Sequence, residues 1–116
     1  MLINTEIKVW IYNKPADMRK SINGLSMIVA DNFSSSPTTG ELFVFYNHLR
    51  DKLKILYWDN NGFVVWYKRL EKGRFIFPKN LTEPLAISNK QLRWLLDGLD
   101  FSKLRGHKKI ENKICF

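Results

Sequence analysis

The stretch KLKILYWDNNGFVVWYKRL, residues 52–70, is typical of a β-hairpin. Two runs that are rich in β-branched and aromatic residues flank a short polar turn. Asn61-Gly62 is the strongest turn signal of this region, because both residues tolerate the positive φ angles of a tight hairpin turn. The sequence therefore predicts two antiparallel strands that are joined at these two residues.

The placement of this turn leaves two registers open for the hairpin. A two-residue loop at Asn61-Gly62 sets Lys54 opposite Arg69, whereas a loop one residue longer sets Lys54 opposite Lys68. In both registers two cations face each other beside aromatic side chains. Like charges directly opposite each other are unfavourable. The pair therefore indicates either an anion-binding site or a solvent-exposed face that tolerates the repulsion.

Segments of similar composition lie on both sides of the hairpin. ELFVFYN (41–47) precedes it and RFIFP (74–78) follows it, and Pro78 closes the last run because proline cannot donate to a strand ladder. IKVWIY (7–12) is a further candidate strand near the beginning of the chain. We therefore expect an antiparallel β-meander of about four to five strands.

One helix is predicted over residues 18–32. Met18, Ile22, Leu25 and Val29 recur at the spacing of a single apolar stripe on a helix. Asp17 stands directly before this stripe and is predicted as its N-cap.

A second helix is predicted over residues 89–98. Ser88 is its expected N-cap, four leucines form its apolar face, and Gly98 is its expected C-terminal signal. The order of elements indicates an α+β fold, with both helices packed on one face of the antiparallel meander.

Length and composition indicate one folded domain. The chain has 116 residues, of which 45% are hydrophobic and 14% aromatic, so it can bury a substantial core. We place a single α+β domain at residues 1–103. Residues 104–116 are basic and show little periodicity, which predicts a flexible C-terminal tail.

The expected compartment is the cytoplasm. No apolar run approaches the roughly 18–20 residues that span a bilayer, so we expect no membrane association. The opening residues MLINTEIKVW place Glu6 and Lys8 where a signal peptide would be apolar. The single cysteine, Cys115, cannot form an internal disulfide.

The charge of the chain indicates an anionic partner. The net charge is +8, from 19 basic and 11 acidic residues. The excess is uneven, because residues 41–80 hold eight basic and four acidic side chains, whereas residues 1–40 hold four and three. Such a field attracts DNA or RNA through phosphate neutralisation. Solubility and an acidic protein partner are the alternatives.

Signals for catalysis are weak. Carboxylates such as Asp17 and Asp59 stand where a cap or a turn requires them. His48 and His107 lack partners at metal-binding spacing, and no phosphate-binding glycine loop or nucleophile motif is present. We therefore expect no catalytic residues, no metal site and no cofactor.

Five sequence strings carry a resemblance to a known family. The chain resembles the TnpB-type, Orf2-like accessory proteins of the insertion sequence 66 family, which are encoded beside a DDE-type transposase. The strings are DMRKSINGL (17–25), LFVF (42–45), KILYWD (54–59), GFVVWYKRLEKGRF (62–75) and LRWLLDGLD (92–100).

This resemblance implies a non-enzymatic accessory protein of insertion-sequence transposition. Its implied partners are the DNA of the element ends and the DDE-type transposase of the same element, so the protein would be associated with the nucleoid when it is bound to DNA. The resemblance supplies no mechanism.

A basic and aromatic surface is the predicted binding site. Its cations would neutralise phosphates, and its aromatic rings could stack on a distorted or single-stranded DNA end. The alternative is a protein–protein adaptor that docks the transposase through the same surface without contacting DNA. Convergence of the cations on one open surface would favour a binding site, and their scattering over both sheet faces would favour plain solvation. The predicted residues are Arg19, Lys20, Lys54, Trp58, Trp66, Tyr67, Lys68, Arg69 and Arg74.

Overall fold

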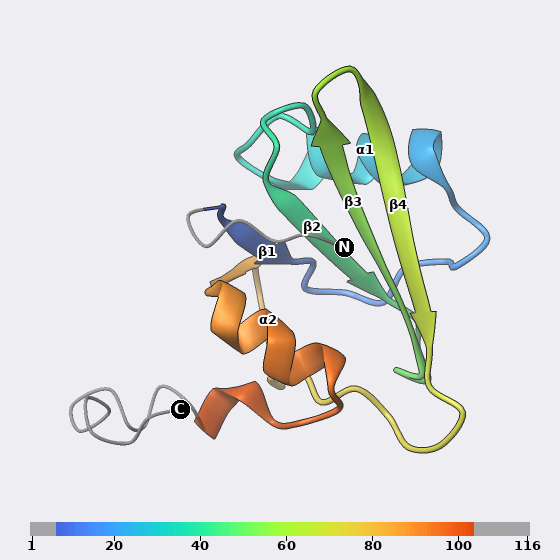
Figure 1. Cartoon of the computed structure of the whole chain (residues 1–116), viewed down its shortest axis with the longest axis vertical. Coiled ribbons are helices and arrows are strands. Elements are labelled where there is room, and N and C mark those ends of the chain that lie inside the picture. The colour runs from blue at the N-terminus through green and yellow to red at the C-terminus, as the bar shows by residue number, and fades with distance from the viewer. Residues whose placement is uncertain (1–6, 104–116) are drawn as a thin grey trace.

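The computed structural model describes residues 7–103, and the predicted tail at 104–116 lies outside these residues (Figure 1). The fold is α+β, with a five-stranded sheet in the order β4-β3-β2-β1-β5 and two α-helices. No helix in this part of the chain is long and apolar enough to cross a membrane. The elements are β1 (Val9–Ile11), α1 (Ile22–Asn32), β2 (Leu42–Tyr46), β3 (Lys52–Asp59), β4 (Gly62–Arg69), β5 (Leu85–Ile87), α2 (Asn89–Leu96) and a short 3-10 helix, η1 (Phe101–Lys103).

The sheet is not purely antiparallel, in contrast to the prediction. Strands β2, β3 and β4 form the expected antiparallel meander, but β1 pairs with β2 in parallel. The connection from β1 to β2 contains α1, and a parallel pair needs a crossover connection of this kind. On its other side β1 pairs antiparallel with β5.

The two helices cover opposite faces of the sheet, so the prediction of one covered face is wrong. Successive side chains of a strand point to opposite faces. Val9 and Ile11 of β1 belong to the core beneath α2, whereas Trp10 and Tyr12 pack with the core beneath α1. Figure 1 shows α1 passing behind β3 and β4. All five residues of β2 (LFVFY) are buried, because both of its faces are covered.

The hairpin turn lies one residue earlier than predicted. Asp59 pairs with Gly62, so Asn60 and Asn61 form the loop. Asn60 has a φ of 58°, a left-handed conformation that asparagine tolerates. Both predicted registers are therefore wrong, and Lys54 faces Tyr67.

Helix α1 begins at Ile22, later than the predicted residue 18, and Asp17 is not its N-cap. Ser21 occupies the N-cap position, but its side chain makes no capping hydrogen bond. Ile22, the second residue of the predicted apolar stripe, is 36% exposed, whereas Leu25 and Val29 are fully buried.

Helix α2 follows its prediction closely. Ser88 and Gln91 form a capping box, in which the Ser88 hydroxyl accepts from the Gln91 backbone and the Gln91 side chain accepts from the Ser88 backbone. The helix ends at Leu96, two residues before the predicted end. Gly98 follows with a φ of 79°, the conformation expected after a helix C-terminus.

The strand predicted at residues 74–78 is absent. This segment alternates as expected, with Phe75 and Phe77 buried and Ile76 42% exposed, but it pairs with no strand. The fifth strand is β5 instead, which was not predicted because its three residues are too few to show a period.

Candidate nucleic-acid interface

The predicted binding residues lie on both faces of the sheet and do not converge on one surface, which is the outcome that favours solvation over a binding site formed by the whole set. Tyr67 and Arg69 alternate along β4 with Trp66 and Lys68, so the two pairs point to opposite faces. Lys54 faces Tyr67 on the side of α1. Trp66 packs against the core on the side of α2.

Lys54 holds the segment that leads into α1. Its ammonium group donates hydrogen bonds to the backbone carbonyls of Met18 and Lys20, both at 2.8 Å. The same nitrogen lies 5.7 Å from the centre of the Tyr67 ring, within the range of a cation–π contact. Both carbonyls belong to residues that were predicted to be helical. Their contact with Lys54 is a physical reason why the helix begins only after them.

Lys68 makes the equivalent contact on the other face. Its ammonium group donates a 2.8 Å hydrogen bond to the carbonyl of Leu96, the last residue of α2. The last carbonyls of a helix have no partner within the helix, and the negative end of the helix dipole attracts a cation there. Lys54 and Lys68 thus fix α1 and α2 from adjacent strands, on opposite sides of the sheet.

Arg19 is engaged locally by Asp17. The Arg19 guanidinium donates to both carboxylate oxygens of Asp17 at 2.8–3.1 Å, and the Arg19 backbone N–H donates to the same carboxylate. These hydrogen bonds lower the pKa of Asp17 to about 2. The neighbouring Lys20 is exposed, although its carbonyl is held by Lys54.

Tyr67 is the most accessible of the three predicted aromatic residues. It is 49% exposed. Trp58 is half-buried and packs edge-on against Phe63, with ring centres 5.0 Å apart. Trp66 is half-buried against the α2-side core. Of these three rings, Tyr67 alone is therefore exposed.

A second group of cations gathers where the hairpin ends. The Leu70 backbone N–H donates to the carbonyl of Asp51, and that of Phe75 donates to the carbonyl of Arg50, at 2.8 and 2.7 Å. These two hydrogen bonds fold the loop after β4 back onto the turn before β3, and Figure 1 shows both segments at the lower end of the hairpin. We call the cations of these segments and of the adjoining strand ends the basic end: Arg50, Lys52, Arg69, Lys72 and Arg74.

Two carboxylates accompany the basic end. Glu71 pairs with Arg69 at 2.9 Å, but both side chains are more than half exposed, so the pair is weak. Asp51 belongs to the turn before β3, where hydrogen bonding to Asn47 lowers its pKa. Five cations against two carboxylates leave this end of the hairpin positive.

The turn that supports the basic end is built around Asn47. Its side-chain oxygen accepts from the backbone N–H groups of Asp51 and Lys52, and its amide donates to the Asp51 carboxylate at 2.7 Å. Arg50 has a φ of 61° in this turn, and its N–H donates to the Asn47 carbonyl. The turn is therefore held by several local hydrogen bonds.

The sequence-based prediction included Arg69 and Arg74 but missed Arg50, Lys52 and Lys72. Lys52 lies directly opposite Arg69, which is the like-charge pair that the incorrect registers assigned to Lys54. A correct placement of the turn at Asn60-Asn61 would have found this pair. The two loop-closing hydrogen bonds that add Lys72 have no signal in the sequence.

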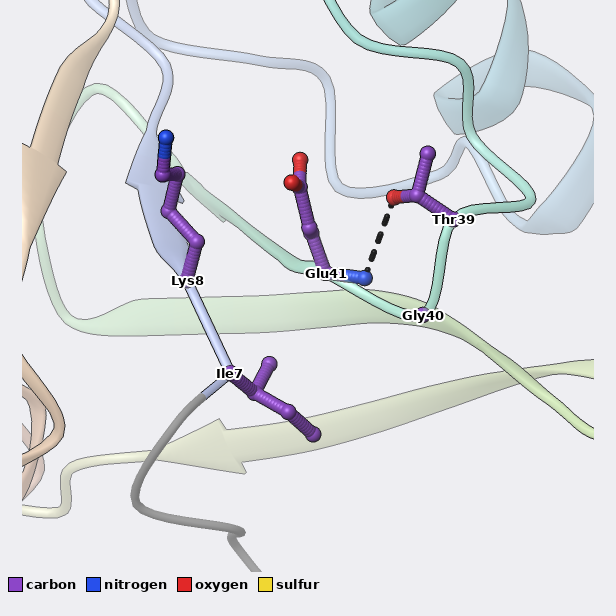
Figure 2. Close-up of a pocket in the computed structure, with 5 residues that line it drawn as sticks. All are labelled: Ile7, Lys8, Thr39, Gly40 and Glu41. Atoms are coloured by element: carbon purple, nitrogen blue, oxygen red, sulfur yellow. Dashed lines mark hydrogen bonds between the residues drawn. The ribbon is translucent and has the colours of Figure 1, made fainter.

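A hollow of about 390 Å³ lies at the opposite end of the sheet from the basic end. Figure 2 shows Lys8 and Glu41 projecting on the same side of it, with the Glu41 backbone N–H donating to the Thr39 hydroxyl. The Glu41 carboxylate also accepts from the Trp10 indole at 3.0 Å. The Trp10 ring also lies 5.2 Å from the Lys8 ammonium group, so Trp10 contacts both charged side chains, which form no recognisable catalytic set.

Comparison with known proteins identifies the family. A model of the IS66 Orf2-like proteins matches residues 7–106, which is most of the chain. The chain belongs to this family. The resemblance found in the sequence strings is thereby confirmed, and it places the protein in a family that is tied to insertion-sequence transposition.

Two relatives come from Sinorhizobium fredii (strain NBRC 101917 / NGR234). The uncharacterized protein y4jC is 32% identical over 99 residues, or 85% of each chain. The uncharacterized protein y4hO is 36% identical over 95 residues, or 82% of this chain and 83% of the relative. No solved structure gives a significant match.

In this IS66 Orf2-like chain, the strings that carry the resemblance contact one another through the two inner lysines. Lys54 belongs to KILYWD and binds carbonyls within DMRKSINGL. Lys68 belongs to GFVVWYKRLEKGRF and binds a carbonyl within LRWLLDGLD. These lysines therefore have an architectural role that the sequence strings alone do not reveal.

Proposed function

We propose that this protein is a non-enzymatic accessory factor of insertion-sequence transposition that binds the DNA backbone through its basic end. Two observations carry the proposal: Lys52 lies opposite Arg69 in the strand ladder, and the backbone hydrogen bonds from Leu70 to Asp51 and from Phe75 to Arg50 return the loop that bears Lys72 and Arg74 to the same end of the hairpin. The family supplies the transposition context.

The basic end suits phosphate better than base recognition. Lys and Arg side chains bind phosphate oxygens and release condensed counterions, which gives affinity without sequence preference. Tyr67 lies two residues before Arg69 and points to the same face, so its exposed ring can stack on an unpaired base beside the phosphates. We therefore expect binding that is non-specific in sequence and stronger for distorted or single-stranded ends.

The remaining predicted cations are given other roles in this proposal. Lys54 and Lys68 hold the two helices, and Arg19 is engaged by Asp17. Lys20 is exposed on the α1 side and could extend the surface beyond Tyr67. The DNA-binding surface is thus smaller than the sequence predicted, and it lies mainly at one end of the hairpin.

Binding to a 30-base-pair duplex, followed by fluorescence anisotropy from low to high salt, tests this proposal. Affinity should fall steeply with salt, and the double variant Arg69→Gln/Arg74→Gln should lower the slope of log K against log salt by roughly two. Lys8→Gln is the matched control, because Lys8 is exposed and lies at the opposite end of the sheet. A flat salt response, or no binding at low salt, would overturn the proposal.

The absence of catalysis is part of the proposal. No three His, Cys, Asp or Glu side chains within residues 7–103 lie close enough to hold a metal ion. Asp17 is committed to Arg19, and Asp59 stands at the hairpin turn. Supercoiled DNA incubated with the protein and Mg²⁺ should stay intact. Metal-dependent cleavage that is lost in Asp17→Asn or Asp59→Asn would overturn this part.

A transposase adaptor is the second candidate function. Leu49 and Ile76 are 59% and 42% exposed, and they lie on the two segments that the loop-closing hydrogen bonds join. Exposed aliphatic side chains beside cations are typical of a protein interface. Retention of the transposase from nuclease-treated extract, lost in Leu49→Ser/Ile76→Ser but not in the equally exposed control Met27→Ser, would support it. Retention that requires DNA would contradict it.

A further inference from the structure

Strand β4 leaves a long sheet edge uncovered within the described part of the chain. It is the outermost strand of the sheet and pairs only with β3 (Figure 1). The pairing runs without a bulge from Asp59–Gly62 to Lys52–Arg69, so the edge is regular along its whole length. Such an edge presents backbone N–H and C=O groups that can pair with another strand.

The centre of this edge lacks the usual protection against pairing. Proteins blunt edge strands with charges, prolines, bulges or short length. The opposite edge follows this rule, because β5 has three residues. In β4, by contrast, residues 63–67 read FVVWY, and charges occur only after them.

The side chains of β4 also indicate a missing neighbour. Residues 62–66 are all half-buried, while the adjacent β3 is fully buried at three positions. Val64 packs into neither of the two core clusters, although it is a β-branched apolar residue in the middle of a strand. A strand added beside β4 would cover these residues.

We propose that β4 pairs antiparallel with β4 of a second copy of this chain, which joins the two sheets into one. A two-fold axis perpendicular to the sheet generates this arrangement, and the same surface is used by both copies. The pairing does not require the proposed DNA binding, since it uses the backbone groups of the β4 edge, and of the basic end only Arg69 lies on that edge.

The charges along β4 favour a second copy of this chain as the partner of its free edge. If the axis passes through Val65, Arg69 lies opposite the partner's Asn61, and if it passes through Trp66, Arg69 lies opposite the partner's Phe63. In these two registers Lys68 and Arg69 do not face their own copies, so like charges stay apart. With the axis at Val65, the partner's Asp59 lies two strands across from Lys68, at about 10 Å, which is attractive.

The dimer would also display two basic ends. Antiparallel pairing puts the two copies of Arg69 at opposite ends of the seam, roughly 20–27 Å apart along the strands for these two registers. Two such ends on one particle would bind DNA with an effective affinity above that of one. This consequence rests on the proposed function, whereas the pairing itself does not.

The mass of the full chain in solution tests the pairing. Light scattering after gel filtration, with reductant present so that Cys115 cannot cross-link copies, should give twice the monomer mass of 13.7 kDa at tens of micromolar. Val64→Lys should give the monomer mass, because it places like charges at the seam without removing a core residue. Met27→Lys adds the same charge at a 61% exposed position of α1 and should remain dimeric.

Amide hydrogen exchange of the wild-type chain gives a second readout that needs no variant. In the dimer, every backbone amide near the middle of β4 should be protected, including those that point away from β3. Alternating fast and slow amides along β4, a monomeric wild type, or a dimeric Val64→Lys would each overturn the proposal. Unchanged mass of wild type after nuclease treatment separates it from DNA-mediated association.

Discussion

The cations in the middle of the β3–β4 hairpin and those at its end have the same chemistry but different surroundings. Lys54 donates to two backbone carbonyls just before α1, and Lys68 donates to the carbonyl of the last residue of α2. Both lysines are half-buried. Arg69 and Arg74 are exposed, and Glu71, which pairs with Arg69, is exposed as well. The difference teaches that the cations of one basic and aromatic string can have different fates: two of them hold the helices, and others stay exposed, where a partner could reach them.

The strongest test of this division is the removal of Lys54. Lys54→Met should lower the free energy of unfolding by about 2–3 kcal/mol, because it removes two charge-assisted hydrogen bonds and leaves two carbonyls without their partner. Chemical denaturation measures this value. Lys14→Met removes the same charge from an exposed lysine and should change little. Equal stability of the Lys54→Met and Lys14→Met variants would contradict the architectural role of Lys54.

Removal of Lys68 should have a smaller effect. Lys68→Met loses one hydrogen bond to the Leu96 carbonyl, and we expect a loss of about 1–2 kcal/mol. Amide exchange should rise at the C-terminal turn of α2 more than in α1, because the lost contact is local. Lys72→Met, at the basic end, is the matched control. A uniform rise in exchange over both helices would argue against a local contact.

The Asp17–Arg19 pair should make the stability of the fold depend on pH in the acidic range. Its hydrogen bonds lower the pKa of Asp17 from 3.8 to about 2, so the folded state favours the carboxylate. The resulting stabilisation is present above pH 3.8 and is lost as the pH falls towards 2. Denaturation across this range should show a shallower pH dependence for Asp17→Asn than for wild type. Arg19→Gln should reproduce the change, and a steeper dependence would contradict the assignment.

The smallest effect on stability is expected at the basic end. Arg69→Gln/Arg74→Gln should unfold at the same denaturant concentration as wild type within error, because exposed ion pairs contribute little. The same variant should bind DNA with the lower salt slope described above. Loss of stability in this variant would show that the end cations, like the inner lysines, serve the fold.

Much of the local structure could be predicted from the sequence. Ser88, Gln91 and Gly98 carry their signals within one short segment, and α2 forms as those signals indicate. Residues 74–78 keep the alternation of their sequence pattern, with Phe75 and Phe77 buried and Ile76 exposed, although the predicted strand does not form. Local hydrogen bonding and periodicity decide these features, so the order of residues is sufficient to find them.

The register of the hairpin could not be predicted from the sequence. The wrong register assigned the like-charge pair to Lys54, in the middle of the hairpin, whereas the pair lies at its end. A shift of the turn from Asn61-Gly62 to Asn60-Asn61 replaces Lys54 by Lys52 opposite Arg69. Each asparagine tolerates a left-handed conformation, so local preference does not choose between neighbouring turns. Long-range packing contributes instead, because in the observed register Phe63 and Val65 pack against the α1-side core and Trp66 packs against the α2-side core.

By itself the sequence determined the class of the fold, the existence of the central strands and both helices, and membership in a family that is tied to transposition. Tertiary structure alone decided three features: which sheet face each helix covers, the parallel pairing of β1 with β2, and which cations lie opposite each other in the hairpin. The reason is distance along the chain. The Lys54 and Lys68 contacts join residues 28–36 positions apart, and no local pattern specifies which carbonyl a lysine will reach.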